Sequence, residues 1–239
     1  MLKINDYRIY TGSMGELVRE VKNSKKKLYI ATINAHSFVE AEKDKLFKKS
    51  LEKADILIPD GASISVATNL FNLKPKLNHR LPGPDFFLEY AKSMEKGTHF
   101  FMGSLPPVLE KIEKRFKKDF PNLKIHTYSP PMYPFSKVEN DKIIKAINKV
   151  KPDVVWVGLT APKQEKWSYE NKDKLNTKLV CPIGAAFDFY AGTLKRAPGW
   201  MQKAHLEWLY RFIKEPRRTY KRYLINNIKF AYYMFKVKQ

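Results

Sequence analysis

Several polar residues stand where short apolar runs of the chain end, and their types suit the transfer of a group to a hydroxyl. Asp60 follows one such run and precedes Gly61, so its carboxylate can accept a proton from an attacking hydroxyl. The same Asp-Gly pair is common in turns, and an aspartate there can also cap the following helix. The sequence therefore offers Asp60 as a candidate general base, with a turn residue as the alternative.

Other residues of the chain could bind an anionic or polar ligand. Arg80 can clamp a diphosphate or be an ordinary surface arginine. Gly103, followed by Ser104, can hold a phosphate on backbone N–H groups or form a plain turn. Gln164 can hydrogen-bond a sugar or a phosphate, whereas Glu165 can equally be an acid favoured by the dipole of a helix that it opens.

Patterns for metal and hydrolase chemistry are missing from the sequence. There is no D-x-D pair, no G-x-S-x-G segment, and the five histidines lack metal-ligand spacing. We therefore expect no metal and no other cofactor.

Residues 195–239 are at once strongly basic and strongly aromatic. Twelve Lys or Arg stand against Glu207 and Glu215, a net charge of +10 in a chain whose net charge is +21. Cations among aromatics suit an anionic membrane surface or a nucleic acid. The alternative is a pair of terminal helices, 203–214 and 217–235, that pack their apolar sides on the domain. The residues expected to contact membrane or acceptor are Trp208, Lys221, Arg222 and Lys229.

Strand-like and helix-like runs alternate along the rest of the chain, which predicts an α/β fold with a Rossmann-like parallel sheet and helices on both faces. The expected strands are 28–33, 56–58, 99–102, 123–127, 154–158 and 179–183. The expected helices are 38–53, 62–71, 84–96, 106–118, 138–149 and 162–175. Ligands bind at the carboxyl ends of such strands. Thr32, Asn34 and Asp188 also stand at or near the ends of these strands. We expect a domain of residues 1–195 with a helical appendage of residues 196–239.

Composition and hydropathy indicate the cellular compartment. The single cysteine, Cys181, excludes a disulfide framework and favours a reducing compartment. The first ten residues lack the apolar core of a signal peptide, and no stretch is apolar for long enough to span a bilayer. We expect a cytoplasmic protein that is peripheral at the inner face of the cell membrane.

Taken together, these segments resemble the WecG/TagA/CpsF glycosyltransferase family. The matching segments stand in order along the chain: T-x-N at 32–34, A-D-x-x-x-P-D-G at 54–61, R-x-P-G-x-D at 80–85, F-x-G at 101–103, V-G-L-x-x-P-K-Q-E at 157–165, G-A-x-F-D at 184–188, A-G-x-x-x-R-A-P-x-W at 191–200 and L-E-W-x-x-R-x-x-x-E-P-x-R at 206–218. The last two are long and specific.

The resemblance implies an inverting transfer of a sugar, of N-acetylmannosamine type, from a UDP-sugar to a sugar on undecaprenyl diphosphate. Products of this family feed wall teichoic acid, common antigen or capsule. The resemblance makes Asp60 the general base. It makes residues 196–239, which we call the tail, the element that reaches the membrane and closes the site with an arginine. The residues implied around the donor and nucleotide are Thr32, Asn34, Arg80, Gly103, Gln164, Glu165 and Asp188, and the candidate arginines are Arg211, Arg217, Arg218 and Arg222.

Two rival classes stay open on the sequence. One is a nucleic-acid binder that uses the basic tail, and the other is a non-catalytic membrane adaptor. We expect the enzyme, with UDP-sugar and lipid-linked acceptor as partners and no nucleic acid; a homo-oligomer is left open.

Overall fold

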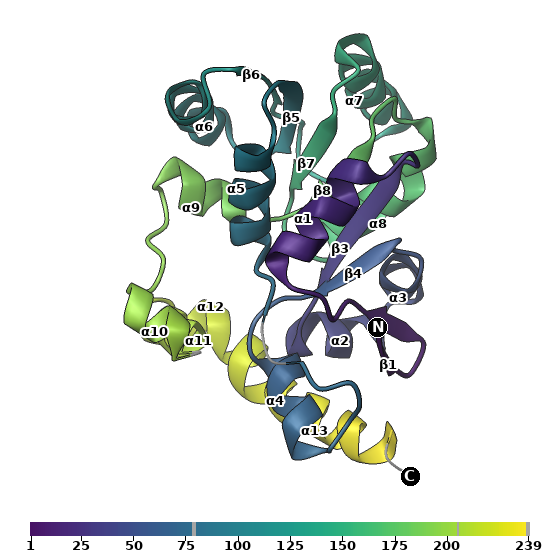
Figure 1. Cartoon of the computed structure of the whole chain (residues 1–239), viewed down its shortest axis with the longest axis vertical. Coiled ribbons are helices and arrows are strands. Elements are labelled where there is room, and N and C mark those ends of the chain that lie inside the picture. The colour runs from purple at the N-terminus through teal and green to yellow at the C-terminus, as the bar shows by residue number, and fades with distance from the viewer. Residues whose placement is uncertain (78–79, 205, 238–239) are drawn as a thin grey trace.

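A computed structural model describes residues 1–77, 80–204 and 206–237. Its centre is an eight-stranded sheet in the order β1-β2-β4-β3-β8-β7-β5-β6 (Figure 1). All neighbouring strands are parallel except the hairpin of β1 and β2. The strands are β1 Leu2–Ile4, β2 Tyr7–Ile9, β3 Leu28–Ile33, β4 Ile56–Pro59, β5 Gly97–Gly103, β6 Leu123–Tyr128, β7 Val154–Gly158 and β8 Leu179–Pro182. The predicted α/β class and its strands are confirmed, whereas the β1–β2 hairpin was missed.

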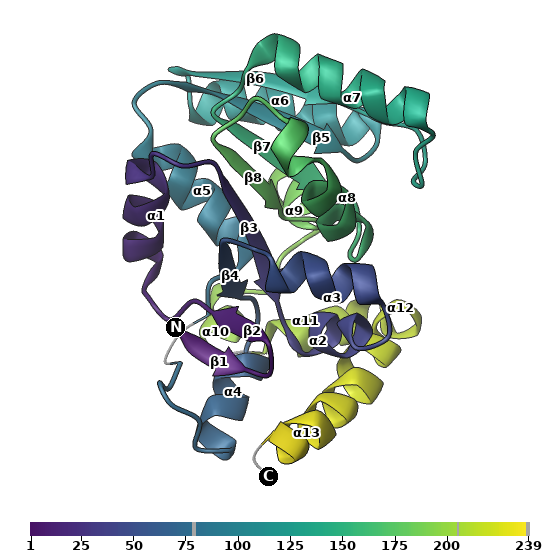
Figure 2. The ribbon, with the colours of Figure 1, turned by 90° about the vertical axis from the view of Figure 1, so that its right-hand side faces the viewer.

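Helices cover both faces of the sheet. Buried side chains of α1, α5, α6 and α9 form one core cluster, and those of α2, α3, α7 and α8 belong to the other (Figure 2). The helices of the body are α1 Met14–Asn23, α2 Ala35–Ala41, α3 Lys45–Glu52, α4 Ser63–Leu70, α5 Gly83–Ser93, α6 Pro106–Asp119, α7 Lys137–Val150, α8 Lys163–Asn171 and α9 Ala186–Ala191. Strand side chains alternate between the clusters, so Ala31 faces one and Ile30 the other.

The helix predicted over 38–53 is in fact two helices, α2 and α3. The Asn34 side chain caps α2, and the Asp44 side chain accepts a hydrogen bond from the N–H of Phe47 at the start of α3. The Asp44 cap offers the backbone an alternative to continuing one helix, which the apolar periodicity does not reveal. Helix α1, whose capping box joins Ser13 and Glu16, was missed altogether.

The C-terminal segment forms α10 Gly199–Lys203, α11 Glu207–Lys214, α12 Pro216–Tyr220, a π-helical turn Lys221–Ile225 and α13 Asn226–Val237. Asn226, Phe230 and Met234 recur every four residues on one side of α13, and all three are buried. The Phe230 ring meets the Phe38 ring of α2 edge-on at 5.2 Å between centroids. The tail is therefore docked on the body through α2.

None of the helices within the described ranges is both long and apolar enough to cross a membrane.

Candidate active site

The carboxyl ends of β3 and β4 bring Asp60 and Asn34 together. Ile33 and Pro59 pair across the two strands, and the Asp60 N–H donates to the Ile33 carbonyl at 2.9 Å. The Asn34 Oδ1 atom accepts from the N–H of Ser37, which caps α2 and fixes the amide. Its Nδ2 group then points to the Asp60 Oδ2 atom, 3.4 Å away. Thr32 lies two residues earlier on β3, beside Ile58 of β4.

Asp60 is a stronger base than an ordinary carboxylate. Burial raises its pKa above the usual 3.8, Arg222 and Arg80 act in the opposite direction, and Glu207 raises it further. A carboxylate held in this way can take a proton more readily than one in water, as a general base must.

The cation that faces Asp60 from the tail is Arg222. It lies in the π-helical turn, and its charge lowers the pKa values of Asp60, Glu165 and His36, although burial is the largest influence on each. Among ion pairs between described residues, none involves Arg222. Its guanidinium lies 5.7 Å from the centre of the Tyr223 ring, and no carboxylate of the described residues neutralises its charge.

The other tail candidates lie elsewhere. The Arg211 guanidinium stands 5.7 Å from the centre of the Phe189 ring, and Arg217 is exposed on α12. The Arg218 side chain lies outside the described residues. Lys221 and Lys229 are exposed, and Trp208 is 37% exposed.

Asn226, one turn after Arg222, fixes the position of this turn on the body. Its Nδ2 group lies 2.6 Å from the His36 Nδ1 atom and donates to the Glu40 carboxylate at 3.1 Å. Burial, and to a lesser extent the Arg222 charge, lowers the pKa of His36 to about 4. His36 is therefore neutral near pH 7, so its Nδ1 atom can accept the hydrogen of the Asn226 amide.

Gln164 and Glu165 form a second polar pair, at the start of α8 beyond β7. The Gln164 Nε2 group donates to the Glu165 Oε1 atom at 2.8 Å, and both side chains are buried. Within the described part of the chain, Gln164 Oε1 and Glu165 Oε2 have no hydrogen-bond partner. Buried acceptors of this kind are rare unless a ligand or water satisfies them. Burial raises the pKa of Glu165 from 4.5 to about 7.

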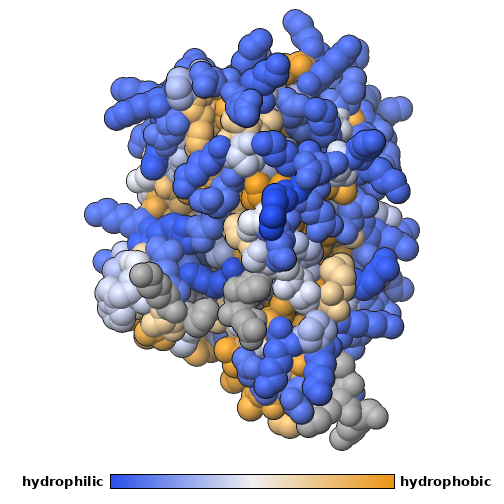
Figure 3. All heavy atoms as spheres, in the orientation of Figure 1, coloured by the Kyte–Doolittle hydropathy of each residue, from blue (hydrophilic) through white to orange (hydrophobic). Residues whose placement is uncertain are grey.

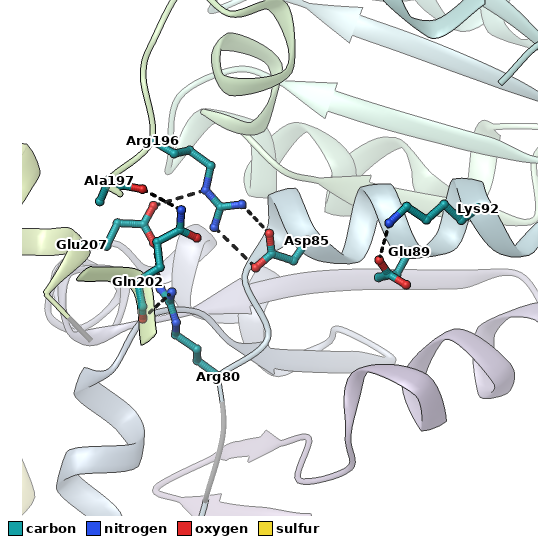
Figure 4. Close-up of polar contacts among 8 residues, drawn as sticks. All are labelled: Arg80, Asp85, Glu89, Lys92, Arg196, Ala197, Gln202 and Glu207. Atoms are coloured by element: carbon teal, nitrogen blue, oxygen red, sulfur yellow. Dashed lines mark hydrogen bonds and ion pairs between the residues drawn. The ribbon is translucent and has the colours of Figure 1, made fainter. Parts of the chain in front are cut away.

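Arg80 is engaged by the tail (Figure 4). Its Nη1 atom is 2.8 Å from Glu207 Oε2, and its Nη2 atom donates to the Gln202 carbonyl at 3.1 Å. The other oxygen of Glu207 lies 3.5 Å from Arg196 Nε, and Arg196 forms an ion pair with Asp85. We call Arg80, Glu207, Arg196 and Asp85 the ion network; it joins the loop before α5 to the first turn of α11.

Gly103 and Asp188 lie at other strand ends. Gly103 has φ +116°, and a Cβ atom there would lie 2.6 Å from the carbonyl of Gly158, so only glycine fits. The Asp188 side chain accepts a hydrogen bond from Thr193 Oγ1 at 3.2 Å, in the segment after α9.

The sequence analysis missed Glu207 and Asn226 as functional residues. Glu207 carried a signal, because it is one of only two acids in the basic segment 195–239. Asn226 carried none, because its role depends on where α13 docks.

Comparison with known proteins identifies the family of this chain. The model of the glycosyl transferase WecG/TagA/CpsF family matches residues 2–239. The chain belongs to this family. It is therefore a glycosyltransferase.

Three curated relatives share one name. A protein of Bacillus subtilis (strain 168) is 30% identical over 79% of this chain and 72% of its own length. A second, from Bacillus spizizenii, is 30% identical over 87% and 79%, and one from Staphylococcus aureus (strain MW2) is 25% identical over 86% and 82%. Each is named an N-acetylglucosaminyldiphosphoundecaprenol N-acetyl-beta-D-mannosaminyltransferase.

We predict that Glu165 makes the stability of this glycosyltransferase fall as pH rises from 4.5 to 7. Because its pKa is about 7 in the folded protein and 4.5 when unfolded, the folded state holds the extra proton in that range. Relative to the wild type, Glu165→Gln should gain about 2–3 kcal/mol in free energy of unfolding between pH 5 and pH 8. Urea unfolding at both pH values measures this gain.

Glu170→Gln removes the same charge at an exposed position of α8 and serves as the control. If the free energy of unfolding of each variant differed from that of the wild type by the same amount at pH 5 and pH 8, Glu165 would be ionised at both pH values.

Proposed function

We propose that the protein transfers an N-acetylmannosamine-type sugar from a UDP-sugar to an N-acetylglucosamine linked to undecaprenyl diphosphate, with inversion at the anomeric carbon. The observation that carries this proposal is Asp60, half-buried at the strand ends beside Asn34, where the charges of Arg222 and Arg80 act on it. The names of the relatives supply the sugar and the acceptor.

The reaction needs one base and compensation for one departing anion. The acceptor hydroxyl oxygen forms a bond to the anomeric carbon of the donor, Asp60 takes the hydroxyl proton, and the bond from that carbon to UDP breaks. Negative charge then grows on the diphosphate, and a cation already in place lowers the barrier most effectively. Arg222 is that cation in our proposal; sequence analysis placed it both among the candidate arginines and among the membrane-contacting residues.

Donor contacts follow from the same geometry. The unpartnered Gln164 Oε1 and Glu165 Oε2 atoms are acceptors for sugar hydroxyl or amide groups. Thr32, Asn34 and Gly103 line the same edge, and Asp188 is assigned to the nucleotide by family resemblance. Arg80 can meet the diphosphate only by exchanging its Glu207 partner.

The tail brings the enzyme to its lipid-linked acceptor in this proposal. Exposed Lys221 and Lys229 and the partly exposed Trp208 are suited to an anionic bilayer surface, where each engaged cation contributes about 1 kcal/mol. The enzyme then works at the inner face of the membrane, in cell-envelope polysaccharide or teichoic acid synthesis.

We predict that Asp60→Asn lowers turnover roughly 10²–10⁴-fold with little change in UDP affinity, because an amide cannot accept the proton. Turnover with a short-chain acceptor and calorimetric titration of UDP measure the two effects. Asp173→Asn, at a side chain that is 83% exposed, is the control. Near-normal turnover of Asp60→Asn would assign Asp60 to the turn alone.

We predict that Arg222→Ala lowers kcat roughly 10²-fold on a soluble acceptor, the loss typical of removing one group that stabilises developing charge. Since Arg222 lowers the pKa of Asp60, its removal should also shift the acid limb of the kcat/KM profile to higher pH. Arg217→Ala, in the adjacent exposed helix, should change neither. A large loss of kcat in Arg217→Ala with little loss in Arg222→Ala would make Arg217 the catalytic arginine.

We predict that transfer proceeds without a divalent ion, because arginines supply the positive charge and the chain has no D-x-D pair. Activity should persist in excess EDTA. Abolition by EDTA with rescue by Mg²⁺ or Mn²⁺ would contradict this mechanism.

A further inference from the structure

Helix α4 presents an apolar face to solvent immediately after the catalytic carboxylate. It begins at Ser63, three residues beyond Asp60, and packs Ile64, Ala67 and Thr68 inward. Val66 and Leu70, four residues apart and therefore on one side of the helix, are 56% and 71% exposed. Side chains of this size on an eight-residue helix are not needed for its packing, because the opposite side makes the core contacts.

Helix α13 carries a matching stripe. Ile228, Tyr232 and Phe235 follow helical spacing and are 73%, 57% and 64% exposed. They lie opposite the buried side, whose central residue is Phe230. The Phe235 ring also meets the Phe71 ring, directly after α4, edge-on at 4.9 Å. The exposed faces of α4 and α13 are therefore neighbours, and Figure 3 shows hydrophobic residues gathered at the end of the molecule where Figure 1 places these two helices.

Cations surround this apolar surface. Lys74 and Lys76 are exposed in the loop after α4, and Lys229 and Lys236 are exposed on α13. The Lys236 ammonium lies 4.8 Å from the centre of the Tyr232 ring. An apolar surface bordered by lysines complements a lipid layer whose headgroups are anionic. A protein partner on this surface would have to place acidic residues opposite these lysines. A second copy of this chain is itself basic, so its charge would be repelled by them.

We propose that α4 is a lipid-contacting element of the body itself, so that α4 and α13 rest together on an anionic bilayer. This inference rests on the proposed function, because that function requires a lipid-linked acceptor. Eight helical residues rise about 12 Å, and α4 begins three residues after Asp60, so one short helix connects the base to the exposed Leu70. The base is then within reach of an acceptor head group whose prenyl chain remains in the bilayer.

The test is vesicle partitioning of the full-length double variant V66Q/L70Q. The vesicles are phosphatidylglycerol–phosphatidylcholine mixtures at low and at high salt. Removing two apolar side chains from the lipid layer should weaken partitioning about tenfold or more at both salt concentrations. Lys229→Glu with Lys236→Glu should weaken it mainly at low salt, because charge attraction is screened.

The matched control is L105Q/V138Q. Leu105 and Val138 are 70% and 64% exposed, next to α6 and within α7, at the opposite end of the molecule (Figure 1). This variant should partition like the wild type. Thermal unfolding of both double variants should match the wild type, because all four side chains are mostly exposed.

Three results would overturn the inference. Unchanged partitioning of V66Q/L70Q would remove α4 from the membrane face. Equal weakening in L105Q/V138Q would show a general loss of hydrophobicity. Loss of an oligomer in sedimentation velocity without a vesicle effect would make the surface a contact between copies.

Failure of the proposed function would look different. The V66Q/L70Q enzyme should transfer sugar to a water-soluble short-chain acceptor at the wild-type rate. If the wild type itself transferred no sugar to that acceptor, the proposed function would fall, while the vesicle result could still be read.

Discussion

A carboxylate half-buried at the end of a parallel strand stays ionised, and can then act as a base, only if cations lie near it. Asp60 and Glu165 are both drawn toward the neutral form by burial, and Arg222 opposes that effect at each of them. The cation comes from the far end of the sequence. The position of the C-terminal helices thus decides which charges act on Asp60, because these helices carry both Arg222, which lowers its pKa, and Glu207, which raises it.

Two separate contacts hold those helices in place, and they differ in kind. The side of α13 with Asn226, Phe230 and Met234 is buried against α2, where it adds apolar area and satisfies His36 and Glu40. The ion network fixes α11 at the other end, with its charged groups mostly shielded from solvent. Apolar burial supplies most of the affinity, while the charged contacts specify the register, because a misplaced partly buried charge costs several kcal/mol. Arg222 lies between these two anchors.

The sequence allowed the sheet and most helices to be predicted because apolar runs and their periods record burial directly. It did not reveal the β1–β2 hairpin, whose strands are three residues each, or the boundary between α2 and α3, which depends on Asp44. At the site, Asp60, Asn34 and Gln164 could be selected because each follows a strand of a parallel sheet. The partnership of Arg80 with Glu207, and of Arg222 with Asp60, could not be predicted, because each joins residues more than a hundred positions apart that only the docked tail brings together.

The charges around Asp60 also order the events of the reaction. Arg80 and Arg196 share the carboxylate of Glu207, so neither is free to meet an incoming diphosphate without giving up that partner. Arg222 has no such partner among the described residues, and it is the cation that a donor can use without disturbing the tail. A donor that engaged Arg80 as well would release Glu207 and loosen α11 as it bound. In the proposed function, full engagement of the diphosphate is therefore coupled to movement of α11. In the proposed function, the donor and the bilayer both bind at the C-terminal helices, so each binding event alters the free energy of the other.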